Sequence, residues 1–430
     1  MVTTRTAVAA IGAAAAIALA LSACSSSPGS EPGAELDPDR AVELDFAWWG
    51  DATRGALYEE AIAVFNEEYP NITIRQQFQS WADYWTARNT EAAGSSLPDV
   101  LAVDAGHAVM YGQQGQLLDL TTQIGVNLDV SEVQESLLQS AAVGEAQYGV
   151  PIGTNSLGLL YNTALLDEFG IAPPEEGYTW EDYADFVSEI SAAGAAQDPP
   201  VYGSADFTGN MQMFSLWLTQ QDIAPYRDNE IAYTREHVIE FLRLGEQLRG
   251  EGVFTPQETL AQLQVPAFNV GVEAATINWA SSLGGAITDL GSDDIGLMLP
   301  PSGPQGPHMS SGISIALAAS ANTTEPDAAA IFIDFLINSP EVGEIFGTTR
   351  GVPATASQRD GVVVEEGSVD ARVLDYAATV EAVATGTPAE EFESFSSIEA
   401  EWIRLGQELQ YGNITIEEFA DTYFTYVDTL

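Results

Sequence analysis

Apolar and polar residues alternate over 41–48, which predicts a strand. Apolar residues then recur at helical spacing from Tyr58 to Tyr69, and Pro70 ends this predicted helix. Ile72 and Ile74 begin a second predicted strand. A strand, a helix and a strand in close succession form a βαβ unit, so we expect a parallel sheet in an α/β fold.

Similar signals continue along the chain. Two Thr-x-x-Asp sequences, Thr179 to Asp182 and Thr324 to Asp327, are typical of capping boxes that begin helices. Residues 194–200 and 300–309 have the composition of loops, and Gly351-Val352-Pro353 interrupts the pattern. Further strands are predicted at 100–103, 157–161, 274–280 and 312–319, and further helices at 211–221, 237–249, 392–409 and 416–426.

The N-terminal segment has the pattern of a secretion signal. An apolar run from Ala7 to Leu21 is too short to span a bilayer, and the single cysteine of the chain, Cys24, follows it. Leu21-Ser22-Ala23-Cys24 resembles a bacterial lipobox, in which cleavage leaves an N-terminal cysteine that carries lipid, palmitate included. We therefore expect a signal peptide at 1–23 and anchoring to the cell membrane through Cys24; the alternative is an ordinary secreted protein with an incidental cysteine.

Composition then sets the number of domains. Residues 24–40 are rich in Ser, Pro, Gly and acid, which predicts a flexible tether with a span on the order of 20 Å. The remaining chain of about 390 residues is long for one core and suggests two domains. Hydrophobic residues make up 46% and aromatic residues 9%, enough for globular cores.

The charge is strongly negative. The 63 acidic residues outnumber 13 basic residues, all of them Arg, and the net charge is −50. Nucleic acid is therefore excluded as a partner, because phosphate binding needs clustered Lys and Arg, and a membrane is expected as a partner only through the lipid anchor. Either genome composition or a salty or alkaline habitat would account for this charge, and the sequence leaves both open.

A set of short sequences follows the tether in a characteristic order. Its pieces are Trp48-Trp49-Gly50 with Arg54, FNEEYPNITI at 65–74, Tyr84-Trp85, Ala93-Gly94 before Leu97-Pro98-Asp99-Val100, GQLLDL at 115–120, Tyr148-Gly149-Val150-Pro151, Tyr161-Asn162, TWED at 179–182, 313–320, 326–337 and Gly351-Val352-Pro353. This ordered set resembles the extracellular solute-binding proteins of ABC importers, in the branch that binds sugars, and the resemblance covers nearly the whole chain after the tether. Ala87 and Thr163 depart from that family, which often carries Lys at these positions.

The resemblance implies a clamshell of two α/β lobes joined by crossover strands, which closes on its ligand. Mapped here, one lobe would comprise 41–152 plus 313–350 and the other 153–312 plus 351–430. The implied function is the capture of a sugar or oligosaccharide and its delivery to the permease subunits of the importer, by a monomer that is not an enzyme. A secreted glycoside hydrolase, or the same fold with a polyol, a peptide or another small solute as ligand, remains an alternative.

A sugar site needs flat apolar rings for the C–H faces and carboxylates, amides or Arg for the hydroxyls. These groups are expected on strand ends and loops that line the cleft between the lobes. The candidates that meet this requirement are Trp48, Trp49, Asp51, Trp81, Asp104, Asn155, Trp217, Trp279, Gly312 and Arg350.

Several candidates have a structural alternative. Alternation places one of Trp48 and Trp49 in the core and the other at the cleft, unless both are core residues. Asp104 could cap a helix, and Asn155 could serve a turn. Trp217 lies in a helical pattern and could pack in the core, while Arg350 could form a structural ion pair.

Other chemistries lack their motifs. The sequence has no GxSxG, no P-loop and no GxGxxG after a strand. His107, His237 and His308 are scattered without the spacing of metal ligands. We therefore expect no cofactor, no metal site and no catalytic residues.

Overall fold

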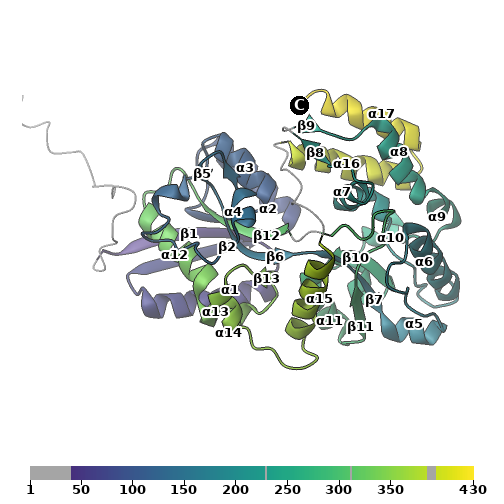
Figure 1. Cartoon of the computed structure of the whole chain (residues 1–430), viewed down its shortest axis with the longest axis horizontal. Coiled ribbons are helices and arrows are strands. Elements are labelled where there is room, and N and C mark those ends of the chain that lie inside the picture. Colours follow the sequence, from purple (N-terminus) through teal and green to yellow (C-terminus); the bar gives the residue numbers. More distant parts are fainter. Residues whose placement is uncertain (1–39, 228–229, 310–311, 385–393) are drawn as a thin grey trace, which may run out of the picture.

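The computed structural model describes residues 40–227, 230–309, 312–384 and 394–430. The predicted signal peptide, most of the tether and Cys24 lie outside the described residues. Two α/β lobes lie side by side along the long axis of the molecule (Figure 1). In the described part of the chain, no helix has the length and apolar character needed to cross a membrane.

The first lobe is built on a six-stranded sheet in the order β13-β6-β12-β3-β1-β2. As predicted, β1 runs parallel to β2, and it also runs parallel to β3. The sheet as a whole is mixed, however, because β12 runs antiparallel to both β3 and β6. The bounds are β1 Val42–Trp49, β2 Ile72–Gln79, β3 Val100–Val103, β6 Val150–Asn155, β12 Gly312–Ala319 and β13 Val352–Pro353.

Helices cover both faces of this sheet. The alternation along β1 sends Leu44, Phe46 and Trp48 to a core shared with α1, α12 and α13, whereas Ala47 faces α2 and α3. The two-residue strands β4 and β5 form a separate hairpin. The bounds are α1 Ala52–Glu68, α2 Trp81–Ala93, α3 Ala105–Gln113, α4 Glu135–Gln139, β4 Ala142–Val143, β5 Ala146–Gln147, α12 Pro326–Asn338, α13 Pro340–Phe346 and α14 Ala356–Gly361.

The second lobe contains a three-stranded antiparallel sheet in the order β10-β7-β11 and a large helical part. Aromatic residues dominate its core, where Phe214 stacks on Trp402 with ring centroids 4.7 Å apart. The bounds are α5 Thr163–Phe169, α6 Trp180–Gly194, α7 Met211–Gln220, β8 Tyr226–Arg227, β9 Glu230–Ile231, α8 Arg235–Leu244, α9 Glu246–Glu251, α10 Gln257–Leu260, α11 Leu283–Leu290, α15 Val369–Val383, α16 Phe395–Gln410, α17 Ile416–Val427, β7 Leu157–Asn162, β10 Ala275–Trp279 and β11 Ile295–Met298.

The chain passes between the lobes where β6 leads into β7 across Ser156. The predicted boundary at 350/351 would place β13 and α14 in the second lobe. In the structure, β13 pairs with β6 and α14 packs against α13, and both of these partners belong to the first lobe. We therefore propose that the boundary lies after α14, at Gly361, and that α15 begins the return into the second lobe.

One capping box is confirmed and the other is wrong. At α6, Thr179 N donates to Asp182 Oδ2 over 2.8 Å and Asp182 N donates to Thr179 Oγ1 over 3.2 Å. At α12, Glu325 is the N-cap without a side-chain bond, and the helix begins at Pro326, whose missing N–H needs no cap. The helix predicted over 237–249 is interrupted at Gly245, which separates α8 from α9.

The described chain begins on the first lobe. Arg40 forms an ion pair with Glu325 at the start of α12. Asn71 Nδ2 donates to Arg40 O over 3.0 Å, just before β2. These contacts join the start of the described chain to two elements of the first lobe.

Candidate functional site

The two adjacent tryptophans at the end of β1 point to opposite faces of the sheet. Trp48 is 1% exposed, and it stacks on Phe78 with ring centroids 4.7 Å apart. Trp49 is half-buried and meets the edge of Trp81 at 5.0 Å. Trp48 is therefore a core residue, as one branch of the prediction had it, although the Phe78 ring on which it stacks is exposed, and Trp49 is the half-buried member of the pair.

Trp49, Trp81 and Trp85 form a tryptophan cluster at this end of the sheet. Trp81 is the first residue of α2, and 46% of it is exposed. Trp85, one helical turn further, lies 5.5 Å from Trp81 and 5.7 Å from Trp49 between ring centroids. Trp85 was missed as a site residue, although its i,i+4 spacing from Trp81 on a helix was a signal for it.

His107 extends this cluster. Its ring stacks on Trp85 with centroids 3.3 Å apart and an interplanar angle of 8°. Asp104 holds the imidazole in place, because its Oδ2 lies 2.7 Å from His107 Nδ1. The other carboxylate oxygen, Oδ1, accepts from His107 N over 2.7 Å and caps α3. The N-cap alternative for Asp104 is therefore realised, and 31% of its side chain is still exposed.

The second lobe approaches this place through α16. A Cβ atom on Gly106 would lie 3.8 Å from Cβ of Phe395, the first residue of α16. Burial raises the pKa of Glu399, one turn along α16, to about 7; the hydrogen bond from Gln212 opposes this rise and the negative charge of Asp104 adds to it. Gln212 Nε2 donates to Glu399 Oε1. Helix α16 of the second lobe therefore lies against α3, beside the tryptophan cluster.

Sequence reasoning missed Glu399 and Gln212. Glu399 lies within a predicted amphipathic helix, where nothing distinguishes it from the other acidic residues of the chain. Its position becomes apparent once the fold brings α16 against α3, a contact between elements far apart in the sequence.

Asn155, Trp279 and Gly312 lie where the two lobes meet. Asn155 Nδ2 donates to Ser281 Oγ over 2.7 Å, so this amide joins β6 to the segment after β10. Trp279 ends β10 and is 39% exposed. Gly312 pairs with Asn155, and a Cβ atom built on it would meet nothing within 4 Å. These three residues border open space near the crossover.

Two other predicted site residues, Trp217 and Asp51, have structural roles. Trp217 is 8% exposed and packs with Phe214 in the core of the second lobe, as its core alternative stated. Asp51 is exposed and caps α1, where its Oδ1 accepts from Arg54 N over 2.9 Å. Their part in ligand binding stays a prediction, which the burial of Trp217 disfavours.

Arg350 is buried among aromatic rings. Its guanidinium carbon lies 4.7 Å from the centroid of Tyr58 and 5.3 Å from that of Phe346. Burial lowers its pKa to about 10. Within the described ranges it forms no ion pair, so the structure contradicts the predicted ion-pair alternative, and with 4% exposure the side chain is not placed to clamp a hydroxyl from solvent.

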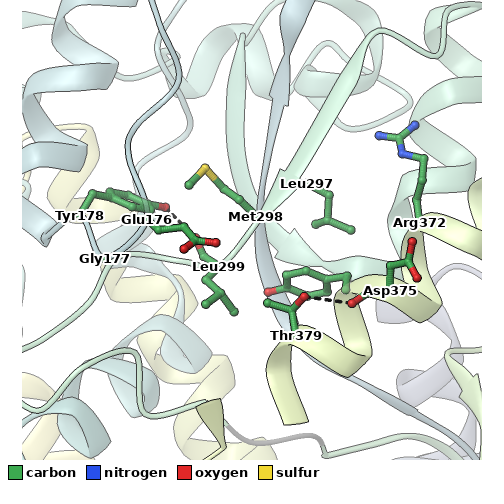
Figure 2. Close-up of a pocket in the computed structure, with 10 residues that line it drawn as sticks. Glu176, Gly177, Tyr178, Leu297, Met298, Leu299, Arg372, Asp375 and Thr379 are labelled. Carbon is green, nitrogen blue, oxygen red and sulfur yellow. Dashed lines mark hydrogen bonds between the residues drawn. The ribbon is translucent and has the colours of Figure 1, made fainter. Parts of the chain in front are cut away.

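A separate cavity of about 300 Å³ lies in the second lobe between β11, α15 and residues 176–178 (Figure 2). The tryptophan cluster does not line it. Among the described residues, no group of three or more His, Cys, Asp or Glu side chains is placed to hold a metal ion.

Comparison with protein families identifies a group of transport-related binding proteins. The model of the bacterial extracellular solute-binding proteins matches residues 49–342. The melibiose/raffinose/stachyose-binding protein MelE of Bacillus subtilis is 28% identical over 174 residues, which are 39% of this chain and 38% of MelE. The matched segment thus spans little more than a third of this curated relative.

Solved structures resemble the whole fold. A periplasmic solute-binding protein from Pectobacterium atrosepticum superimposes with a TM-score of 0.77 at 22% identity, over 90% of this chain and 98% of that one. A periplasmic oligogalacturonide-binding protein from Yersinia enterocolitica, in complex with saturated digalacturonic acid, gives a TM-score of 0.75 at 21% identity, over 89% and 96%. At such identities the likeness concerns the fold.

Proposed function

We propose, since the chain belongs to the bacterial extracellular solute-binding proteins, that it captures a sugar or oligosaccharide and delivers it to the permease of an ABC importer. The name of MelE, a relative that binds melibiose, raffinose and stachyose, supports a sugar as the ligand. The observation that carries the proposal is the tryptophan cluster beside Asp104, where α16 of the other lobe, the helix that carries Glu399, packs against α3.

The chemistry of this place suits a neutral polyhydroxylated ligand. The exposed face of Trp81 offers flat apolar area to the C–H face of a sugar ring. Asp104 and Glu399 supply oxygen acceptors for hydroxyl groups. The chain has no Lys, Arg350 is buried, and Arg54 beside the cluster already donates to Trp49 O, so the site has little positive charge left for the carboxylate of a uronic acid.

Closure of the lobes supplies the mechanism. In a two-state equilibrium the ligand favours the state in which it makes more contacts. Trp81 and Asp104 belong to the first lobe, whereas Trp279 and Glu399 belong to the second. A ligand held by both sets stabilises the closed form, which the permease then recognises, and no covalent step is involved.

A thermal-shift screen tests the function directly. Neutral mono- and oligosaccharides are added to the purified protein, with galacturonate oligomers as an anionic comparison. A ligand that binds the folded form raises Tm, so we expect at least one neutral sugar to do so and the galacturonates to have less effect. Hydrolysis of a bound oligosaccharide at stoichiometric protein would instead favour the glycoside hydrolase alternative.

We further propose that the protein is a monomer anchored outside the cell by lipid on Cys24. Cys24→Ala removes the attachment atom, so the variant is expected in the soluble fraction while the parent sediments with membranes. Cells expressing each form are fractionated and the protein is detected by immunoblot. Ser26→Ala, a neighbouring change that leaves the thiol in place, is the control; membrane retention of the Cys24 variant would contradict lipidation.

A further inference from the structure

The cavity in the second lobe has an apolar floor and a charged rim. Leu297 and its neighbours on β11 form the floor, and Tyr178 closes one side (Figure 2). Arg372 and Asp375 on α15 stand on the opposite side. Its volume of about 300 Å³ is at the lower end of the range for ligand pockets. The cavity therefore has room for a small occupant.

The floor is also the free edge of a sheet. Strand β11 pairs with β7 on one side and lies at the end of its three-stranded sheet. Asp294 O accepts from Thr163 N over 2.9 Å, which fixes the register of the ladder. Because the bonding direction alternates along an antiparallel strand, the backbone groups of Ile295, Leu297 and Leu299 point away from β7.

Two of these three outward carbonyls already have donors. Arg372 Nη2 donates to Ile295 O, and Tyr178 Oη donates to Leu299 O over 3.1 Å. Between them, neither the N–H nor the C=O of Leu297 has a hydrogen-bond partner among the described residues. Leu297 is half-buried and lines the cavity, so this donor and acceptor pair is open to an occupant.

A few residues after β11, at Ser302, the chain already pairs with another extended backbone segment, at Tyr178 and Thr179. Ser302 N donates to Tyr178 O over 2.7 Å, and Thr179 forms a parallel bridge with Ser302. Extended backbone beside this edge is therefore compatible with the surrounding structure. A strand added at Leu297 would meet the same geometry, with about 4.8 Å between strands.

The rim selects the charge of the occupant. The carboxylates of Glu176 and Asp375 line the cavity, and neither has an ion pair among the described residues. Arg372, the cation at the rim, is already bonded to a backbone carbonyl of β11. The chain has a net charge of −50, so a basic side chain is attracted here and an acidic one is repelled.

We propose that this cavity binds a short extended peptide segment with a basic side chain, which pairs with the N–H and C=O of Leu297 and adds a strand to β11. Main-chain hydrogen bonds give such strand addition its affinity, and the flanking pockets give it specificity. This binding site is distinct from the proposed sugar site and does not depend on it.

Calorimetry with defined peptides tests the proposal. The probe is acetyl-Val-Arg-Val-amide, and its companions are the same peptide with its backbone nitrogens methylated and acetyl-Val-Glu-Val-amide. Methylation keeps the charge but removes the donors for the strand, so we expect binding at least about tenfold weaker, and no binding of the acidic peptide. Equal binding of the methylated peptide would show charge attraction alone and overturn the proposal.

Variants of the cavity complete the test. Leu297→Pro removes the outward N–H but no ladder bond to β7, and Asp375→Asn removes one rim charge. Each is expected to weaken the probe at least severalfold without changing sugar binding, and Asp375→Asn should also leave Tm unchanged. Glu240→Gln, an exposed change on α8, is the matched control for charge. If Leu297→Pro does not fold, Asp375→Asn and the methylated peptide still decide, and unchanged affinity in both would refute the site.

Discussion

Trp81 presents the most exposed ring of the tryptophan cluster, with 46% of its surface accessible. Trp81→Ala removes a stacking surface but little packing, so we predict sugar affinity at least about tenfold weaker with Tm nearly unchanged. Isothermal titration with a sugar from the screen measures the effect. Tyr411→Ala, a similarly exposed aromatic at the end of α16, is the control. An unchanged Kd for the Trp81 variant would remove Trp81 from the site.

At the residue scale, the sequence predicted the direction of a side chain better than the residues that surround it. Alternation along β1 separated Trp48 from Trp49, because side-chain direction in a strand follows a fixed period. The environment of Arg350 could not be predicted, since Tyr58 and Phe346 reach it from α1 and α13 through tertiary packing. The same applies to Glu399, whose high pKa arises from burial against another lobe.

At the scale of elements, the sequence predicts the same capping box at the N-termini of α6 and α12, but the two helices begin differently. We predict that Thr179→Ala destabilises the protein by about 1 kcal/mol, because a reciprocal capping pair is lost at α6. Thr324→Ala at α12 is the internal control and should change stability by less than about 0.5 kcal/mol, because α12 begins at Pro326 without a side-chain cap. Urea unfolding measures both, and equal losses would contradict this assignment.

Local sequence was sufficient for many elements but not for their pairing, and α2 and α15 were not among the helices predicted from it. The capping pair of α6 and the βαβ unit at the start of the first lobe depend on residues close in sequence. Strand β12 lies antiparallel between β3 and β6, which are more than a hundred residues away in the sequence. No local sequence pattern can therefore predict this pairing. The pairing of β13 with β6 likewise joins segments more than a hundred residues apart.

At the scale of the whole molecule, two buried carboxyl groups make stability depend on pH. Burial raises the pKa of Glu273 from 4.5 to about 7 and that of Glu399 to about 7. A carboxyl with a raised pKa in the folded state binds its proton more tightly when folded. Its contribution to stability is therefore fully present below pH 4.5 and is lost as the pH rises through about 7.

We predict that Tm is higher at pH 5 than at pH 8. For Glu273 alone the loss is on the order of 3 kcal/mol, because each pKa unit corresponds to ~1.4 kcal/mol. Thermal unfolding monitored by circular dichroism from pH 5 to pH 8 measures it, and Glu273→Gln should reduce the slope. The exposed Glu240→Gln should leave the slope unchanged. A Tm that rises with pH in the parent protein would contradict the prediction.

The ion pair of Arg40 with Glu325 has a consequence for the direction of movement. It places the start of the described chain, Arg40, on the half of the molecule that contains Trp49 and Trp81, close to where α12 begins. If lipid on Cys24 anchors the chain as proposed, the connection to the membrane enters through that half. On closure, the half with Trp279 and Glu399 then moves relative to the anchored half. A transport partner would therefore meet one lobe in a fixed position and one lobe that changes position.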